Sequence, residues 1–226
     1  MLPWLLALGT AALLQAQPAL GMRAFVTGAP ACSAKHCFGI VAHVVVIGEE
    51  PVQTPAWFAR QVAEANGLFA NIDVGFVVAE VRSAAAELAD ISSRSDRDGL
   101  GKGEHDPHVV HVWVVRRLAD VDIEGDEIRG VHWRDRRDTT RRYVILSSIA
   151  PPRVLAHELG HFFGLPHSKY AVSIMNKTPR TDPPGPERGF HPKELAIMTR
   201  ERDAMIADGT LKPRKRMRPR IGGRTP

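Results

Sequence analysis

Hydrophobic and polar positions follow two different periods along the chain, and these periods predict strands that alternate with helices. Buried strands are indicated by apolar runs rich in valine or other β-branched residues at 40–47, 74–81, 109–116 and 143–148. A fifth run, 130–134, is short and flanked by charges, which is typical of a strand at the edge of a sheet. We therefore predict a sheet of about five strands.

Helical spacing appears between the first two strands and again near the end of the chain. Thr54 and Pro55 form a helix-start signal, and apolar residues then recur at helical spacing at Phe58, Val62, Ala65 and Phe69. A strand-helix-strand order predicts a right-handed crossover between parallel strands. Residues 192–208 predict a last helix that turns Leu195, Met198, Met205 and Ile206 toward the core. Residues 83–107 read as a polar surface excursion with at most a short helix near 84–89.

One stretch, residues 157–167 (HELGHFFGLPH), combines a helical pattern with metal-binding chemistry. On a helix, His157 and His161 lie one turn apart on the same face. Gly164 and Pro166 favour a helix end and a turn that would bring His167 back toward the other two imidazoles. Three histidines leave one position of a tetrahedral Zn²⁺ open, as in catalytic sites, and Glu158 is placed to serve as general base.

These residues resemble the metzincin clan of zinc endopeptidases, whose pattern is HExxHxxGxxH followed by a methionine-containing turn. Ser173-Ile174-Met175-Asn176 looks like that turn, and Ser168 and Met175 look most like the matrixin branch. The resemblance implies that Met175 packs beneath the metal. It also implies that an edge strand binds an extended peptide, for which Val131, His132 and Trp133 are the candidates. The proline-rich segment 177–189 would then form one wall of a substrate pocket.

The pattern departs from that of some families in the clan. Astacins and serralysins carry a tyrosine two residues after the methionine, and here that position is Lys177. The usual inhibitory cysteine motif and the structural-zinc segment of matrixins are not found in this sequence.

The chain of 226 residues, 44% of them hydrophobic, is long enough for one well-cored domain. We expect an α+β fold of the metzincin type: a mixed, twisted five-stranded sheet with a crossover helix, an active-site helix, a Met-turn and a C-terminal helix. We expect three segments, a signal peptide (1–21), a catalytic domain (22–210) and a basic disordered tail (211–226). The predicted function is a zinc-dependent endopeptidase acting on peptides or proteins. Two alternatives are a zinc-dependent amidase on a non-peptide or cell-wall substrate and a non-catalytic zinc-binding protein.

The N-terminal residues indicate export. Residues 2–14 form an apolar run of signal-peptide length, and Ala19-Leu20-Gly21 fits a small-x-small cleavage pattern. We expect a secreted or periplasmic protein; an uncleaved membrane anchor is the alternative. In an exported protein, the neighbouring Cys32 and Cys37 favour a local disulfide. The alternatives are that one thiolate reaches the zinc and holds the enzyme latent, or that both thiols are free.

Charge is concentrated at the C-terminal end. Residues 211–226 hold seven basic residues and no acid, so removing them from the formal charge of +5 leaves −2 for the rest. Such a tail could contact an anionic surface, but a solvated tail with no dedicated partner is the favoured interpretation. We expect no dedicated nucleic-acid partner and a monomeric protein.

Further metal sites are open hypotheses. The acidic loop of Asp120, Asp122, Glu124, Asp126 and Glu127 could hold a structural Ca²⁺ or be solvated. A second structural metal could be held by His105, Asp106, His108 and His111, against the alternative of a solvated loop. His43 is predicted to be a core histidine rather than a ligand.

Overall fold

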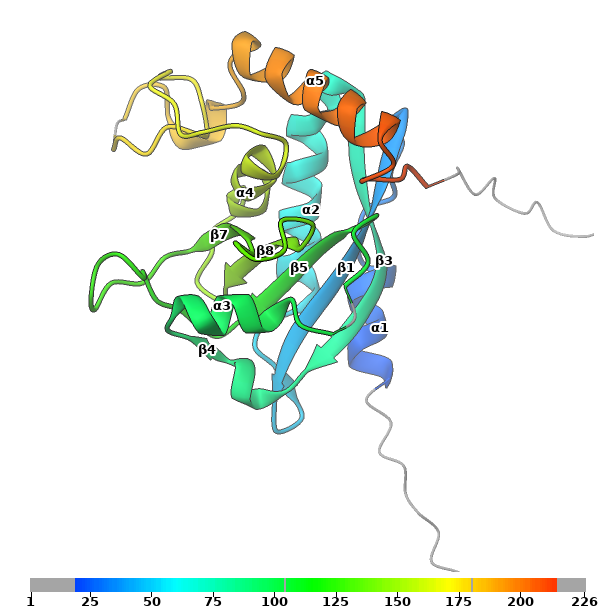
Figure 1. Ribbon diagram of the computed structural model, residues 1–226, viewed down its shortest axis with the longest axis vertical. Coiled ribbons are helices and arrows are strands. Elements are labelled where there is room, and N and C mark those ends of the chain that lie inside the picture. The colour runs from blue at the N-terminus through cyan, green and yellow to red at the C-terminus, as the bar shows by residue number, and fades with distance from the viewer. Residues whose placement is uncertain (1–18, 104, 180, 215–226) are drawn as a thin grey trace, which may run out of the picture.

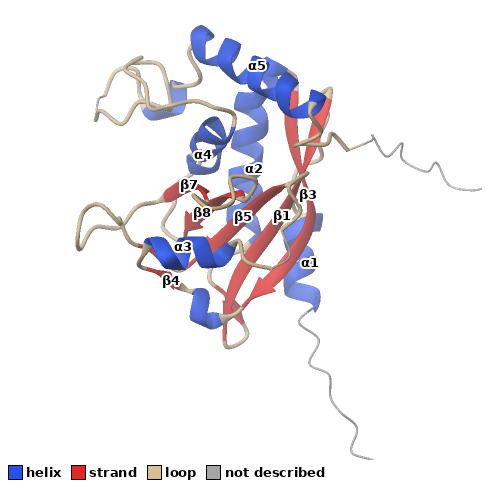
Figure 2. Cartoon of the chain, viewed as in Figure 1, coloured by secondary structure: helices blue, strands red, loops and turns tan. Residues whose placement is uncertain are grey.

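The computed structural model describes residues 19–103, 105–179 and 181–214. Figures 1 and 2 show a twisted sheet with helices on both sides and with α5 across the top of the view. The helices are α1 (Ala19–Thr27), α2 (Pro55–Phe69), α3 (Arg94–Leu100), α4 (Val154–Phe162) and α5 (Pro192–Ala207). Short 3₁₀ helices are η1 (Ala70–Ile72), η2 (Ala86–Leu88) and η3 (Gly185–Glu187). Within the described ranges, no helix is long and apolar enough to cross a membrane.

The main sheet confirms the expected mixed topology. Its principal strands are β1 (His36–Ile47), β3 (Val74–Ala84), β5 (Val110–Val115), β8 (Arg142–Ser147) and β7 (Gly130–Arg134). They lie in the order β3-β1-β5-β8-β7, and the two-residue β2 (Glu50–Pro51) adds a sixth strand on β1. β3, β1, β5 and β8 are parallel, whereas β7 runs antiparallel to β8 at the edge. The predicted crossover between parallel strands β1 and β3 and the predicted edge strand at 130–134 are both confirmed.

Two hydrophobic cores lie on opposite faces of this sheet, because successive side chains of a strand point to opposite sides. In β8, Val144 and Leu146 join the larger core, whereas Tyr143 and Ile145 join the smaller one. Residues from α1, α2, α4 and α5 complete the larger core. The smaller core is closed by Leu100 of α3 and by the paired strands β4 (Asp90–Ile91) and β6 (Arg117–Leu118). With both faces covered, the parallel strands read as continuous apolar runs.

The crossover helix α2 begins as the sequence predicts. Thr54 is its N-cap, and the Thr54 hydroxyl accepts a hydrogen bond from the amide of Trp57. Pro55 occupies the first turn, where its missing amide hydrogen has no partner to lose. Phe58, Val62, Ala65 and Phe69 are buried along one face, as expected from their spacing.

Three parts of the chain differ from the sequence-based expectations. Residues 83–107 contain the helix α3, which was not predicted, in addition to the short η2 near the expected position. Helix α1 was also not predicted; it begins at Ala19, so the predicted signal-peptide boundary at residue 21 falls inside it. The buried Phe25 of α1 packs against Phe58 with ring centroids 6.1 Å apart. Residues 1–18 lie outside the described part, so the signal peptide remains a prediction.

The start of the predicted tail is ordered, which corrects the expectation of disorder from residue 211. Leu211 is buried, and its amide donates to the carbonyl of Met205. The amides of Lys212 and Arg214 donate to the carbonyls of His108 and Cys37. These bonds hold residues 211–214 against the sheet; residues 215–226 lie outside the described part.

Cys32 and Cys37 form a disulfide, as predicted. Both sulfurs are therefore engaged with each other, and neither is available as a thiolate ligand for a metal. Gly75 on β3 lies directly over this bond, where an added Cβ would meet the Cys32 sulfur at 2.6 Å.

A pair of buried histidines lies between the sheet and its outer layer. His43 is buried, as predicted, and its Nε2 lies 2.9 Å from Nδ1 of His111. The His43 ring stacks on Trp113, with centroids 4.1 Å apart. Burial lowers the pKa of His43 to about 3 and that of His111 to about 4. Both rings are therefore neutral in the folded protein at neutral pH.

This pair predicts an acid-sensitive stability. An unfolded histidine titrates near pH 6.5, so between about pH 6.5 and 4 the unfolded chain binds more protons than the folded protein does. The free energy of unfolding therefore decreases as the pH is lowered through this window. Each group contributes roughly 1 kcal/mol per pH unit in this window. In urea unfolding with chelator present, His43→Phe keeps the stack on Trp113 and should lose less stability than the wild type between pH 7 and pH 5. An equal loss in both proteins would contradict this assignment.

Candidate active site

The histidine motif lies on α4 and on the turn that follows it. α4 presents His157 and His161 one turn apart, and it ends at Phe162. Gly164 then adopts a left-handed conformation with φ 86°, and the amide of Leu165 bonds back to the carbonyl of Gly160 at 3.0 Å. This glycine-dependent helix end is the one predicted, and it reverses the chain so that His167 returns to the two histidines of the helix.

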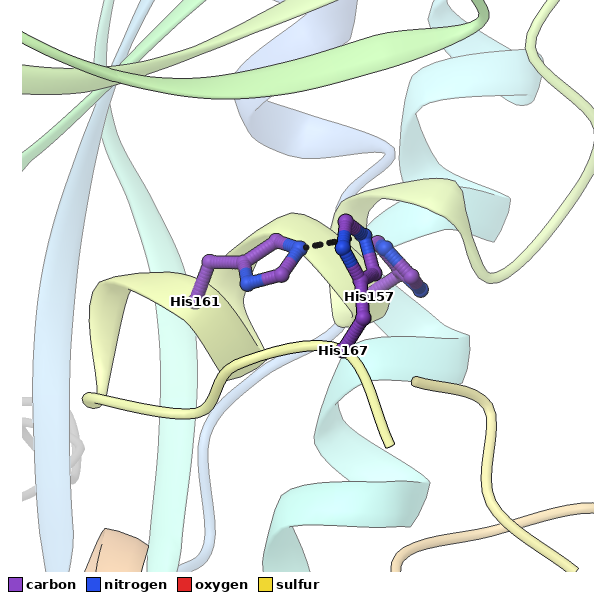
Figure 3. A group of neighbouring side chains, drawn as sticks. All are labelled: His157, His161 and His167. Atoms are coloured by element: carbon purple, nitrogen blue, oxygen red, sulfur yellow. Dashed lines mark hydrogen bonds between the residues drawn. The ribbon is translucent and has the colours of Figure 1, made fainter. Parts of the chain in front are cut away.

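The three imidazoles converge on one point. Figure 3 shows the side chains of His157, His161 and His167 directed toward one another. One nitrogen from each ring can be chosen so that all three lie within 4.8 Å of one another. Nε2 of His161 and Nε2 of His167 are 3.1 Å apart. Such a set of three nitrogens fits a divalent ion of the size of Zn²⁺.

Backbone carbonyls orient two of the three rings. Nδ1 of His157 lies 2.7 Å from the carbonyl oxygen of Ile174, and Nδ1 of His161 lies 2.7 Å from that of Leu165. A carbonyl only accepts, so each Nδ1 carries the proton and each Nε2 keeps a lone pair for a metal. The donor set therefore fits zinc in protonation as well as in position.

Burial keeps all three rings uncharged, as metal ligands must be. It lowers the pKa of His157 and of His167 to about 4, and it also lowers the pKa of His161. At neutral pH the pocket therefore presents three neutral imidazoles to a cation.

Met175 lies where the resemblance places it. Its side chain is buried against α4, and an added Cβ on Gly160 would meet the Met175 sulfur at 2.6 Å. Gly160, between the two helical histidines, is thus the residue that lets the methionine turn approach the helix.

A buried carboxylate that the sequence did not single out holds this turn to α5. The Ser173 hydroxyl lies 2.7 and 2.8 Å from the two carboxylate oxygens of Glu194 and accepts a bond from the Met175 amide at 2.9 Å. Glu194 also accepts the amide of His191, as part of a capping box at the start of α5. In the sequence, Glu194 looks like an ordinary helix-capping residue.

Glu158 is buried between α4 and the edge strand β7. Burial raises the pKa of the Glu158 carboxyl to about 8, opposed by the hydrogen bond that it accepts from the His132 amide at 2.7 Å. Gly130 makes this contact possible, since an added Cβ there would meet Val154 at 2.6 Å and the Glu158 side chain at 3.1 Å. The predicted general base thus directly follows the ligand His157 in the sequence, and its carboxylate is hydrogen-bonded to the edge strand.

The edge strand differs in detail from the expectation. The His132 amide points away from β8, toward Glu158, so the backbone groups of Val131 and Trp133, which alternate with it, point toward β8. Of the three candidates, only His132 directs its amide to the cleft. The Trp133 side chain binds Asp98 through its ring N–H at 2.8 Å and lies over Arg97.

A cleft of about 1270 Å³ runs between β7 and α4 and is lined by all three histidines and by Glu158. It exceeds the range of roughly 300 to 1,000 Å³ typical of small-molecule sites, so it can hold an extended chain.

Arg153 fixes the far wall of this cleft, which the sequence did not reveal. It caps α4 in a left-handed conformation with φ 81°. One of its guanidinium nitrogens donates to the carbonyls of Gly185 and Arg188, at 2.9 and 2.6 Å. Another donates to Glu64 of α2 at 2.9 Å. Arg153 thus ties the proline-rich segment to the helical layer.

The other metal hypotheses find no support in the described ranges, where the histidine triad is the only group of three or more potential ligands that converges. In the acidic loop, Asp122 pairs with Arg94 and Glu127 with Arg117. Nε2 of His111 lies against the backbone of Asp106, and Nδ1 lies against His43.

Comparisons with known proteins identify the family to which the sequence is similar. The family described as matrixin, a peptidase family, matches residues 63–186, which is more than half of the chain. A solved structure of archaemetzincin from Methanopyrus kandleri is similar at 14% identity and a TM-score of 0.49, covering 74% of this chain and 96% of that one. No curated protein matches the chain.

The sheet, the convergent histidines and the open cleft define a zinc metallopeptidase. The chain belongs to the matrixin family.

The contacts of Arg153 with the carbonyls of Gly185 and Arg188 predict that this segment becomes more mobile when the guanidinium is removed. Arg153→Gly accepts the left-handed backbone but loses both carbonyl contacts, so the amides of Gly185, Glu187 and Arg188 should exchange hydrogen about tenfold faster. Glu64→Gln is the matched control, because it removes the ion pair and leaves the carbonyl contacts. Hydrogen exchange measured by mass spectrometry distinguishes the two, and unchanged protection in Arg153→Gly would refute the anchoring role.

Proposed function

We propose that the protein is an endopeptidase in which His157, His161 and His167 hold the zinc and Glu158 is the proton shuttle. One observation carries this proposal. Three neutral imidazoles converge beside a buried carboxylate in the wall of an open cleft. When bound, zinc would polarise the scissile carbonyl and acidify the attacking water.

The residues of the chain divide the remaining work. Glu158, the neighbour of His157, would accept the proton of the attacking water on its carboxylate and return it to the amine nitrogen that leaves. Ile174 and Leu165 hold two imidazole rings through their carbonyls, while Met175 supports the helix beneath them. Glu194 in turn keeps the methionine turn in place through Ser173.

Substrate binding would use the free edge of β7. A peptide added as a strand needs a donor on that edge, and the His132 amide is directed into the cleft. In the structure this amide is occupied by Glu158. A substrate carbonyl that takes the amide would therefore free the carboxylate at the moment when a peptide is in place. The volume of the cleft favours such a chain over a small amide.

The shuttle role predicts separate effects on turnover and on metal content. Glu158→Gln keeps an oxygen that can accept the His132 amide but cannot take a proton, so it should retain zinc and lose about 10²- to 10⁴-fold in kcat. His161→Ala removes a ligand and should lose both zinc and activity. Zinc per chain and hydrolysis of a diverse peptide mixture are measured together.

One control variant and two contrary outcomes serve to interpret the result. His36→Ala, on a histidine at the start of β1 outside the cleft, should keep zinc and activity. Hydrolysis at the wild-type rate by Glu158→Gln would remove Glu158 from the mechanism, whereas full zinc content in His161→Ala would remove His161 from the ligand set.

We also propose that the protein is exported through residues 1–21. The disulfide between Cys32 and Cys37 supports this, because such bonds persist in oxidising compartments. A cut after Gly21 leaves Phe25 in the mature chain, where its ring fills the core beside Phe58. N-terminal sequencing of the exported protein should give Met22 as the first residue. Retention of the chain inside the cell with residue 1 intact would overturn the proposal.

A further inference from the structure

The acidic side chains that line the cleft all have partners within the protein, whereas several of the basic ones have none in the part of the chain that the structure describes. Four carboxylates face the cleft, and each already has a protein partner. Asp122 pairs with Arg94 and Glu127 with Arg117. Asp120 accepts backbone amides of the acidic loop, including that of Asp122 at 2.8 Å, and Glu158 accepts the His132 amide. The acidic side of the lining is thus committed within the protein.

Basic side chains outnumber these carboxylates in the lining, and three of them are uncommitted. Six face the cleft: Arg97, Arg129, Arg134, Arg153, Lys177 and Arg188. Arg153 and Arg97 bind carbonyls of the chain, as described for Arg153 and as shown by the 2.7 Å bond from Arg97 to Ala119. By contrast, the exposed side chains of Lys177, Arg129 and Arg134 make no ion pair or hydrogen bond with any residue of the described ranges.

Lys177 is the uncommitted cation that follows the methionine turn of the metal site. It follows Met175 by two residues, in the segment that leaves the floor of the metal site. It lines the same cleft as His157, His161, His167 and Glu158. An ammonium on this lining can meet an acidic side chain of a peptide that occupies the cleft.

Arg129 and Arg134 extend the positive lining to both ends of the edge strand. Arg129 immediately precedes β7, and Arg134 is its last residue. At about 3.3 Å per residue, their Cα atoms lie roughly 16 Å apart along the strand. A peptide of five or six residues paired with β7 would therefore meet a cation near each end.

General basicity of the protein does not explain this lining. The formal charge is +5, but the seven basic residues of 211–226 account for more than all of it. The other residues, 1–210, together carry −2. A cationic cleft in a slightly acidic body is a local feature, and it focuses the electrostatic field on a ligand of opposite charge.

We propose that the cleft selects acidic peptides, and that Lys177 recognises an Asp or Glu side chain adjacent to the bond that is cut. Arg129 and Arg134 attract further carboxylates along the same peptide. This inference rests on the proposed function for its substrate, a peptide, and adds the class of side chain that the site prefers.

The test uses peptide pairs that differ only by Glu or Gln at one position on either side of the cut bond. The wild type should hydrolyse the Glu peptide of one pair with a kcat/KM about five- to tenfold higher. Lys177→Met, which keeps the length of the side chain, should bring the ratio close to one. Lys177→Glu should reverse the preference within the pair, and it should cleave a third peptide, with Lys at the same position, faster than the Glu peptide. Lys193→Met on α5, outside the cleft, is the matched control and should keep the wild-type ratio.

A binding arm separates this proposal from the proposed function. Zinc-loaded Glu158→Gln, labelled Glu and Gln peptides and fluorescence anisotropy give the two dissociation constants without turnover. The preference for the Glu peptide should weaken as salt rises from 50 to 300 mM, about two- to threefold in ratio. If the wild type cleaves no peptide, the proposed function fails, and the binding ratio still decides the present one. Equal binding of the two peptides, or a preference that survives Lys177→Met, overturns it.

Discussion

The whole site depends on the reversal of the chain at the end of α4. A helix can bring only His157 and His161 to one face, so the third imidazole must come from a segment that turns back. Gly164 supplies the left-handed residue for that turn, and the carbonyl of Leu165 is thereby placed against the ring of His161. The same turn carries His167 to within 3.1 Å of His161. One backbone conformation thus both delivers a ligand and orients another.

Close approach of three backbones is the second requirement, and two glycines provide it. Gly160 lets the methionine turn lie against α4 from one side, and Gly130 lets β7 lie against α4 at Glu158. With a methyl group at either position, neighbouring side-chain atoms would lie 2.6 Å from it, inside normal contact distance. The helix that carries the chemistry is therefore clamped between turn and strand. The proton shuttle is desolvated by this packing, which is why its pKa is high in the absence of a cation.

Much of this arrangement could be predicted from the sequence, because it depends on local patterns. Apolar runs located the five main strands, Thr54 and Pro55 located the start of α2, and the spacing of 157–167 gave the triad. The missing parts depend on contacts between segments far apart in the chain. Glu194, Arg153 and Gly130 act through partners 21, 32 and 28 positions away, respectively, and nothing in their neighbours along the chain marks them. Helix α3 had a signal, the capping box of Ser93 and Asp96, but its seven polar-rich residues resemble a loop.

The last residues that the structure describes also determine from which side of the sheet a fused segment would leave. The amide of Arg214 is bonded to Cys37 on β1, whereas the cleft lies along β7, with β5 and β8 between them. Three inter-strand spacings of about 4.8 Å separate the two, roughly 14 Å across the sheet. An anchor, label or domain fused directly after Arg214 would consequently leave from the β1 side of the sheet. The catalytic groove of an immobilised enzyme would then stay open to polymers arriving from solution.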